Sequence, residues 1–177
     1  IGSMLNAEYE RLLRLATAIE MLHTATLVHD DLIDGAILRR GIPTLNSKWS
    51  PAATVLTGDF LFASASDMAS KTNSVEVMQL IAATLMTIVN GEVDQLFTNH
   101  CITSVDEYYR RIYSKTASLF ETSTHTAAVI SNVDRRQIEV LRKFGYELGM
   151  AFQIVDDVLD YVGDESTVGK PVGGDLR

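Results

Sequence analysis

Residues 27–34 read LVHDDLID, and residues 154–160 read IVDDVLD. Both motifs lie in apolar segments whose nonpolar residues recur at three- and four-residue steps, the period of an α-helix. Residues four apart share a helix face, so two aspartates of each motif should point together, Asp30 with Asp34 and Asp156 with Asp160. Carboxylates this close repel one another, and burial raises the cost. Mg²⁺ would relieve that repulsion, because it takes oxygen ligands and keeps some waters.

A lone motif of this kind is most often a solvated helix face, because aspartate is usually exposed. Two copies, each within an apolar segment and each followed by basic residues, favour a metal site instead. Arg39 and Arg40 follow the first motif directly, in a loop interrupted by Gly41 and Pro43. The planar guanidinium group suits phosphate oxygens. The sequence therefore predicts a site where cations meet a phosphate-bearing ligand.

The composition is that of one globular domain, and it excludes several classes of function. The 177 residues carry 15 basic and 23 acidic side chains, a formal charge of −8. This balance argues against nucleic-acid binding, which needs basic groups to neutralise phosphates. Cys101 is the only cysteine, which excludes an internal disulfide and a cysteine-based zinc site and suggests a reducing cytoplasm. The sequence predicts neither a signal peptide nor a transmembrane segment.

The spacing of apolar residues predicts an all-α protein without strands. Long helices are expected at about residues 6–33, 51–70, 75–98 and 135–162. Gly35 should end the first helix and Asp134 should cap the last. The apolar stripe of the last helix is expected to face the core, with Ile138, Leu141, Phe144, Leu148, Ala151, Phe152, Val155 and Leu159.

Two shorter helices are expected between the third and the last long helix. Ser104 and Glu107 have the spacing of a capping box, and the helix that follows them should end near residue 113. A new helix should open at residue 114. Lys115 and Thr116 in its first turn would then offer a diphosphate a cation, a hydroxyl and free backbone donors.

The combined motifs resemble those of the trans-isoprenyl diphosphate synthases, also called polyprenyl synthetases. The matching segments are 23–34 (HTATLVHDDLID), 39–41 (RRG), 58–59 (GD), 115–116 (KT), 152–160 (FQIVDDVLD) and 169–176 (GKPVGGDL). The likeness extends over nearly the whole chain. It implies an isoprenoid-synthase-type helix bundle around a central active-site cavity, and a homodimer.

The resemblance also implies roles for individual residues. Two or three Mg²⁺ ions would be held mainly by Asp30, Asp34 and Asp156, with help from Asp31, Asp157 and Asp160. Arg39 would hold the allylic diphosphate. Isopentenyl diphosphate would contact Arg40 and His23. The allylic substrate and its departing diphosphate would contact Lys115, Thr116, Gln153 and Lys170. The six aspartates and Lys115 are the implied catalytic residues.

The implied reaction is Mg²⁺-dependent chain elongation. The diphosphate leaves an allylic carbon, the double bond of isopentenyl diphosphate attacks that carbon, and a proton is lost to the released pyrophosphate. The family also has an upstream Gly-Gly-Lys-x-x-Arg element and C-terminal helices. The resemblance therefore implies that residues 1–177 form a single polyprenyl synthetase domain without the N-terminal and C-terminal parts of the family fold.

The residues just before the first motif suggest the length of the product. Short-chain members of the family often carry aromatic residues there, which close the floor of the cavity. Ala25 and Thr26 occupy the fifth and fourth positions before Asp30, and both are small. A growing chain could pass them, so we expect a product of C20 or longer, of the geranylgeranyl or a longer type.

Three other interpretations remain open at this point. A non-catalytic subunit of a heteromeric prenyl synthase would share most of these motifs, but such subunits tend to lose one aspartate motif. A class I terpene cyclase shares the first motif and usually has an Asn/Asp-Ser/Thr-Glu pattern as its second. A structural bundle that binds Mg²⁺ or Ca²⁺ would explain the carboxylates but not Arg39, Arg40 and Lys170.

Overall fold

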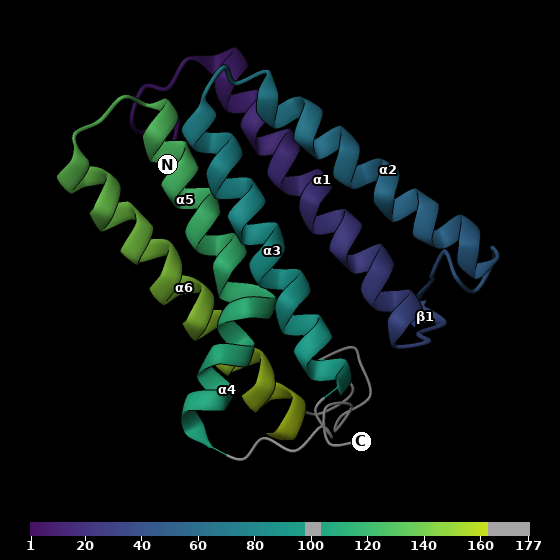
Figure 1. Cartoon of the computed structure of the whole chain (residues 1–177). Coiled ribbons are helices and arrows are strands. Elements are labelled where there is room, and N and C mark those ends of the chain that lie inside the picture. Colours follow the sequence, from purple (N-terminus) through teal and green to yellow (C-terminus); the bar gives the residue numbers. More distant parts are fainter. Residues whose placement is uncertain (98–103, 163–177) are drawn as a thin grey trace.

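The computed structural model describes residues 1–97 and 104–162, and its helices confirm the predicted all-α class (Figure 1). In chain order the helices are α1 (Tyr9–Ile33), α2 (Pro51–Ser70), α3 (Val75–Phe97), α4 (Val105–Ile112), the π turn η1 (Tyr113–Ala117), α5 (Ser118–Ile130) and α6 (Arg135–Val162). None of the helices in these two ranges is long and apolar enough to cross a membrane.

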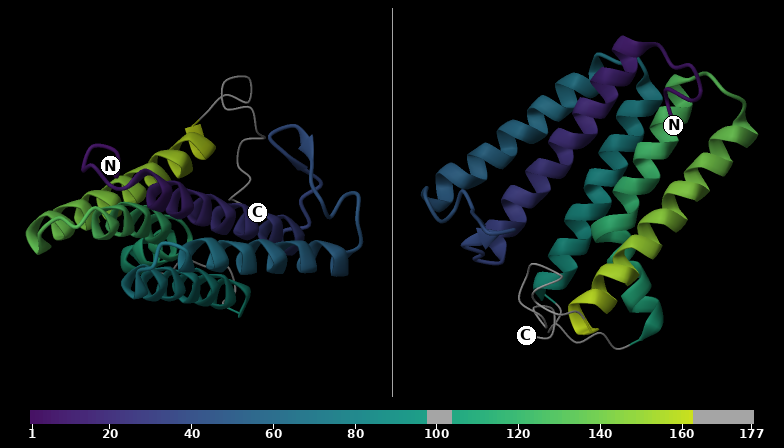
Figure 2. Two further views of the ribbon diagram at one scale, coloured as in Figure 1. Left: turned by 90° about the horizontal axis from the view of Figure 1, so that it is seen from above. Right: turned by 180° about the vertical axis from the view of Figure 1, so that it is seen from behind.

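The long helices alternate in direction along the bundle. α1 packs against α2 as an antiparallel pair, α5 packs against α6 in the same way, and α3 lies between the two pairs (Figures 1 and 2). As a result, the C-terminal ends of α1, α3 and α6 lie at the same end of the bundle. The two aspartate motifs occupy two of these three ends.

The main core lies where α1, α2, α3 and α5 meet. Its buried members are Leu15, Ala18, Leu22, Ala65, Ala69, Val77, Ile81, Ala127 and Ile130. Burying one large aliphatic side chain contributes about 1.5–3 kcal/mol to folding, so this cluster fixes how the four helices pack. The α1 members all precede the first aspartate motif. The core therefore positions the motif without enclosing it.

The helix ends follow the predicted signals. The Ser104 hydroxyl accepts a hydrogen bond from the backbone N–H of Glu107 at 3.1 Å, and an Asp134 carboxylate oxygen accepts one from Gln137 N–H at 2.8 Å. Gly35 follows the end of α1 with a φ of +63°, a conformation that glycine adopts without strain. These three boundary predictions are confirmed.

The prediction that the chain has no strand is wrong for residues 38–43. Two very short strands, β1 (Leu38–Arg39) and β2 (Ile42–Pro43), pair antiparallel after α1. Arg40 and Gly41 form the turn between them, with φ values of +50° and +76°. Positive φ at both central residues is typical of a type I′ turn. The usual sequence signal for that turn, Asn-Gly or Asp-Gly, is missing here, so the pattern did not reveal it.

The prediction of a helix start at residue 114 is also wrong. α4, η1 and α5 form one continuous helical segment, in which the π turn adds a residue. The backbone N–H of Ser118 donates to the carbonyl of Tyr113, five residues earlier. Lys115 and Thr116 lie inside this turn rather than at a helix N-terminus. They therefore do not bring the free backbone donors expected for a diphosphate site.

The predicted core face of α6 is largely exposed. More than two fifths of the surface of each of five stripe residues is accessible, namely Phe144, Leu148, Phe152, Val155 and Leu159. The buried positions of α6 include Gly145 and Gly149 instead. Hydrophobic periodicity favoured the face with the larger side chains, whereas the helix packs through the face with the smaller ones.

These two glycines allow α6 to lie very close to the η1–α5 segment. A Cβ atom at Gly149 would lie 2.6 Å from Cα of Ala117, and one at Gly145 would lie 2.7 Å from the carbonyl oxygen of Phe120. Both distances are too short for real contacts with backbone atoms. Any larger residue would therefore push α6 away from its neighbour.

Gly149→Ala should lower the free energy of unfolding by about 1–3 kcal/mol, because the added methyl group overpacks the contact with Ala117. Alanine is favoured over glycine in helices by about 1 kcal/mol, which opposes the predicted effect. Urea denaturation measures the difference. Lys143→Ala, at an exposed position of the same helix, is the control and should change stability little. Unchanged or increased stability of Gly149→Ala would contradict the prediction.

Candidate functional site

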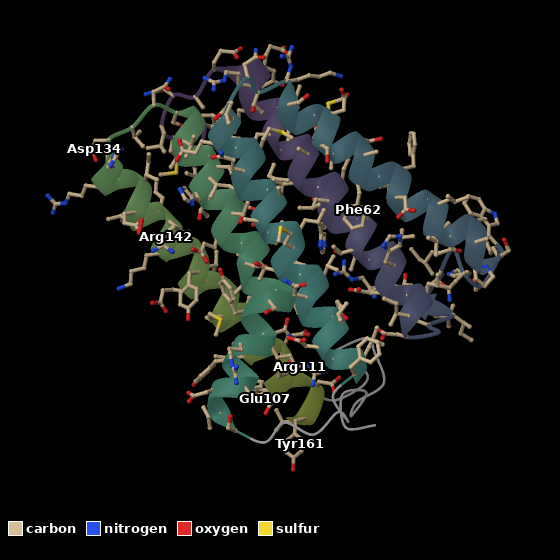
Figure 3. The ribbon with its side chains drawn as sticks, in the orientation of Figure 1. Phe62, Glu107, Arg111, Asp134, Arg142 and Tyr161 are labelled. Carbon is tan, nitrogen blue, oxygen red and sulfur yellow. The ribbon has the colours of Figure 1, made fainter. Side chains whose placement is uncertain are left out.

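The fold brings acidic residues that are distant in sequence to one end of the bundle. α1 carries the first aspartate motif at its C-terminal end, and α6 carries the second near its own (Figure 1). Figure 3 marks this end of the molecule with Arg111 on α4 and Tyr161 on α6. The alternating helix directions explain the arrangement.

Asp30 lies among more negative than positive charge. Its pKa is raised to about 6, first by burial and then by the carboxylates of Glu92 and Asp34, while Lys115 and Arg39 oppose the rise. The Lys115 ammonium group is 3.3 Å from a carboxylate oxygen of Glu92. This group joins α1, α3 and η1. Its excess of negative charge is the condition that a divalent cation relieves.

Asp31 faces the hairpin rather than this acidic group. The Arg39 Nε donates to an Asp31 carboxylate oxygen at 2.8 Å, and the Asp31 side chain is almost fully buried. Arg40, the next residue, is exposed in the turn. The two arginines predicted to bind phosphate therefore differ, because only Arg39 is fixed to the first motif.

His29, also within the first motif, packs α1 against α2. Its Nε2 lies 3.1 Å from the carbonyl oxygen of Val55, and its ring meets Phe62 edge to face at 5.3 Å. Gly58 leaves space for this ring, since a Cβ there would lie 2.1 Å from Nε2. A carboxylate oxygen of Asp59, in the matching segment 58–59, lies 3.6 Å from the same nitrogen.

The second motif is held through its middle aspartate. Asp157 accepts a hydrogen bond from the Gln153 amide at 2.8 Å on one oxygen, and from the Tyr108 hydroxyl at 2.6 Å on the other. Asp160 is buried, and Asp156 is half-buried. The carboxylates of this motif thus have three different environments on one helix.

The π turn directs two consecutive residues toward different motifs. Lys115 lies beside Glu92 and the first motif, as described above. The Thr116 hydroxyl donates to the side-chain oxygen of Gln153 at 2.5 Å, and Gln153 in turn binds Asp157. π turns are rare and occur often at functional sites. Here the turn connects the two aspartate motifs.

A pocket of about 180 Å³ opens beside Asp30, between α1, α2 and α3. Its lining residues are Thr26, His29, Asp30, Ile33, Phe62, Ile88, Val89, Glu92, Val93 and Leu96. The walls are mainly apolar, and Asp30 and Glu92 provide the acidic groups. Thr26 lines this pocket, whereas Ala25 is completely buried and is not a lining residue.

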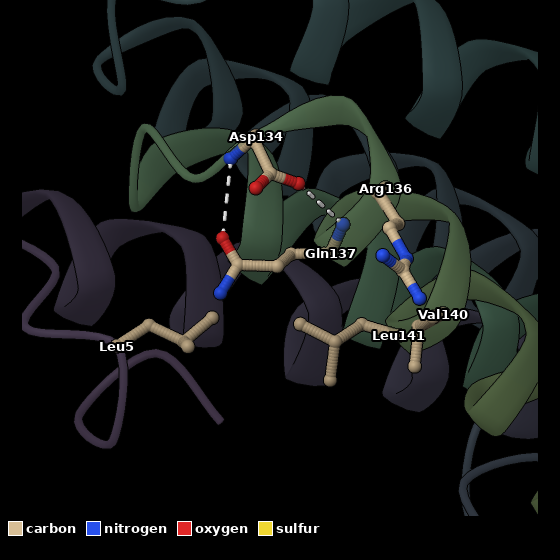
Figure 4. Close-up of a pocket in the computed structure, with 6 residues that line it drawn as sticks. All are labelled: Leu5, Asp134, Arg136, Gln137, Val140 and Leu141. Atoms are coloured by element: carbon tan, nitrogen blue, oxygen red, sulfur yellow. Dashed lines mark hydrogen bonds between the residues drawn. The ribbon is translucent and has the colours of Figure 1, made fainter.

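A larger pocket of about 450 Å³ (Figure 4) lies at the opposite end of the bundle, where Figure 3 labels Asp134. It is formed between the N-terminal segment and the start of α6, by Leu5, Asp134, Arg136, Gln137, Val140 and Leu141. Asp134 and Gln137 hydrogen-bond to each other there as the helix cap. None of the predicted site residues lines this pocket, so it is separate from the aspartate motifs.

Two predicted site residues remain, and the structure describes one of them. His23 is exposed on α1, about two turns before Asp30. Lys170 lies outside the described residues. Within residues 1–97 and 104–162, no three histidine, cysteine, aspartate or glutamate side chains form a group that could hold a metal by themselves. The oxygen donors suit Mg²⁺ in kind, but a ligand with its own oxygens would have to complete the coordination.

Two residues that the sequence did not identify contribute to this end of the bundle. Glu92 lies four residues after Ile88 on the face of α3 that lines the pocket. An acidic residue within an apolar stripe is a signal that could have indicated a functional site, but the prediction was based on the aspartate motifs. Tyr108 gave no such signal, because a tyrosine in an amphipathic helix is ordinary and Asp157 is far away in the sequence.

Comparison with known proteins identifies the family. The sequence profile of the polyprenyl synthetase family matches residues 1–177, and the chain belongs to this family. It is 41% identical over 164 residues to solanesyl-diphosphate synthase 2, chloroplastic, of Oryza sativa subsp. japonica, a match that covers 92% of this chain and 41% of that protein. It is 39% identical over 163 residues to heptaprenyl diphosphate synthase component 2 of Bacillus subtilis, which covers 92% of this chain and 47% of that protein.

Solved structures agree with this assignment. The polyprenyl synthase of Caulobacter crescentus CB15, complexed with calcium and isoprenyl diphosphate, superimposes with a TM-score of 0.92 at 42% identity, covering 99% of this chain and 54% of that one. The decaprenyl diphosphate synthase of Rhodobacter capsulatus gives a TM-score of 0.85 at 41% identity, covering 93% and 51%. The chain thus spans about half the length of the relatives it matches.

Asp30→Asn should stabilise the metal-free protein at neutral pH. Folding raises the pKa of Asp30 from 3.8 to about 6, so the folded state keeps the proton to a higher pH than the unfolded state does. The free energy of unfolding therefore falls as the pH rises through this range. Asparagine avoids that loss. After discounting for solvent screening, the expected gain is about 1–2 kcal/mol at pH 7.5 and close to zero near pH 4.

Denaturant unfolding between pH 4 and pH 8 in the presence of EDTA measures this difference. Glu20→Gln, at an exposed position of α1, is the control and should give a small change that does not vary with pH. A difference between Asp30→Asn and the wild type that is constant or shrinks as the pH rises would contradict the prediction.

Proposed function

We propose that this protein is a chain-elongating prenyltransferase that condenses an allylic prenyl diphosphate with isopentenyl diphosphate and releases pyrophosphate. The observation that carries the proposal is the arrangement around Asp30. An acidic group with Lys115 and Arg39 nearby lies at the mouth of a mainly apolar pocket, and the second aspartate motif lies at the same end of the bundle. A diphosphate with a hydrocarbon tail has the matching chemistry.

The cation sites follow from the same residues. Asp30, Asp34 and Asp156 would hold Mg²⁺ together with oxygens of the diphosphate, since two or three ions bridged in this way need few protein ligands. When bound, Mg²⁺ would stabilise the negative charge that develops on the departing diphosphate. One relative of known structure was solved with calcium and isoprenyl diphosphate, which supports a divalent cation in this family.

The basic residues of this chain have separate tasks in the proposed reaction. Lys115, beside Glu92, can shift its ammonium group toward a diphosphate without leaving the acidic group. Arg39, anchored on Asp31, is fixed for the allylic diphosphate. His23 and Arg40 are exposed and would meet isopentenyl diphosphate. Lys170, which is not among the described residues, is proposed to contact the diphosphate on the basis of the sequence alone.

The bond changes need no basic side chain. The allylic carbon–oxygen bond breaks, the isopentenyl double bond forms the new carbon–carbon bond, and the proton lost afterwards goes to the pyrophosphate. The chain's contribution is to orient both substrates and to keep the pocket apolar, so that water does not capture the allylic cation. Ile33, Val89 and Val93 provide apolar wall surface of this pocket.

The proposal includes the assembly and the location. The outer face of α2 exposes Leu56 and Phe60, more than 65% accessible each, and this face would suit a homodimer. A cytoplasmic location would suit the single cysteine. Residues 1–177 are proposed to form one domain of the synthase.

Incorporation of isopentenyl diphosphate tests the proposed function. The purified protein at its natural length should transfer radiolabelled isopentenyl diphosphate to one or more allylic primers in the presence of Mg²⁺, and EDTA should abolish the transfer. Incorporation only after a second subunit is added would favour a partner in a heteromeric synthase. Conversion of a primer to cyclic products without incorporation would favour a terpene cyclase. No incorporation under any of these conditions would rule out the synthase.

Thr26→Phe should shorten the product, because Thr26 lines the pocket beside Asp30 and a phenyl ring there would fill much of its volume. Wild type is expected to release products of C20 or longer, and the variant mainly shorter ones, as separated by chromatography. Ala16→Phe adds the same ring at an exposed position of α1 and should leave product length unchanged. A Thr26→Phe enzyme with wild-type products would show that this pocket does not hold the growing chain.

A further inference from the structure

Tyr108 on α4 reaches the second aspartate motif on α6. Its hydroxyl donates to one carboxylate oxygen of Asp157 at 2.6 Å. The other oxygen of Asp157 receives the amide of Gln153 at 2.8 Å. Both donors are neutral, so they fix the orientation of the carboxylate without adding an opposite charge beside it.

The contact continues into the π turn. Gln153 can donate to Asp157 only through its nitrogen, because a carboxylate accepts but does not donate. Its side-chain oxygen is therefore directed at Thr116, whose hydroxyl donates to it at 2.5 Å. Tyr108, Asp157, Gln153 and Thr116 thus form one connected chain of hydrogen bonds. These hydrogen bonds join α4, α6 and η1 at the end of the bundle where the motifs lie.

The middle aspartate of each motif accepts hydrogen bonds from side chains of other residues. Asp31 is held by Arg39, and Asp157 is held by Tyr108 and Gln153. Since consecutive helical residues lie about 100° apart, fixing the middle aspartate sets the direction of its neighbour on the same turn. Anchoring Asp157 therefore limits the rotation of the last turns of α6, which carry Asp156.

We propose that Tyr108 is a positioning residue, which fixes the second aspartate motif through Asp157 so that Asp156 is presented to the cations and the diphosphate. The role rests on the proposed function, because it assumes that the motif binds a metal–diphosphate complex. In this role Tyr108 acts through Asp157 and needs no contact of its own with the substrate. Removing its hydroxyl should weaken the binding of the complex without removing any ligand from it.

Tyr108→Phe tests this role, with Tyr109→Phe as the matched control. Tyr109 is the adjacent residue of α4, and its ring is in contact with that of Tyr108, but it is exposed. Calorimetry with inorganic pyrophosphate and increasing Mg²⁺ gives the Mg²⁺ concentration at half-saturation. We expect about a tenfold increase for Tyr108→Phe and less than twofold for Tyr109→Phe, because a hydrogen bond to a carboxylate is stronger than one between neutral groups.

Steady-state kinetics separates positioning from general damage. In Tyr108→Phe, kcat at a fixed low Mg²⁺ concentration should fall about tenfold and recover when Mg²⁺ is raised, while KM for isopentenyl diphosphate stays within twofold. The melting temperatures of the two variants in EDTA should be similar. Calorimetry does not require turnover, so a protein without condensation activity would refute the proposed function and still report on Tyr108.

The double variant gives an independent measurement. In an Asp157→Asn background, Tyr108→Phe should have little further effect on the Mg²⁺ dependence, because both changes act on one contact. Additive effects would overturn the proposal. An unchanged Mg²⁺ dependence in Tyr108→Phe, an equal change in Tyr109→Phe, or a loss that high Mg²⁺ does not restore would overturn it as well.

Discussion

The close contact between α6 and the π turn is the constraint on which the second half of the site depends. Gly149 lets the α6 backbone approach Ala117 at a distance that no side chain would allow. Gln153 lies one helical turn further along the same face, where it meets Thr116. If the helices were further apart, the hydrogen bonds from η1 to the second aspartate motif would be out of reach. The close packing at Gly149 thus determines the direction of the Asp157 carboxylate.

Around Asp30, the distribution of charge lowers the stability of the folded protein at neutral pH. Burial and neighbouring carboxylates disfavour ionised Asp30 in the absence of a cation. Lys115 and Arg39 offset this effect only in part, since the pKa of Asp30 stays raised. Such incomplete compensation is common at functional sites, where the ligand supplies the missing interaction. If the proposed function holds, the binding free energy of a cation–diphosphate complex would include the relief of this repulsion.

Most of the fold and the two motifs could be predicted from the sequence, because the determining signals are local. Helix periodicity and capping residues such as Ser104 and Asp134 gave the boundaries. The buried face of α6 could not be predicted, since periodicity measures the size of apolar side chains and says little of how closely Gly145 packs. The contact of Tyr108 with Asp157 depends on the arrangement of distant helices, and nothing local records it.

The hairpin after α1 makes its two arginines unequal for a geometric reason. Arg39 closes β1 and turns back to Asp31, whereas Arg40 adopts the left-handed conformation of a turn that only a few residue types tolerate. In a paired strand, a shift of one residue reverses the side to which every side chain points. A residue inserted between α1 and Arg39 would therefore turn the Arg39 side chain away from Asp31. Over evolutionary time, insertions should accumulate after residue 43 far more readily than between α1 and Arg39.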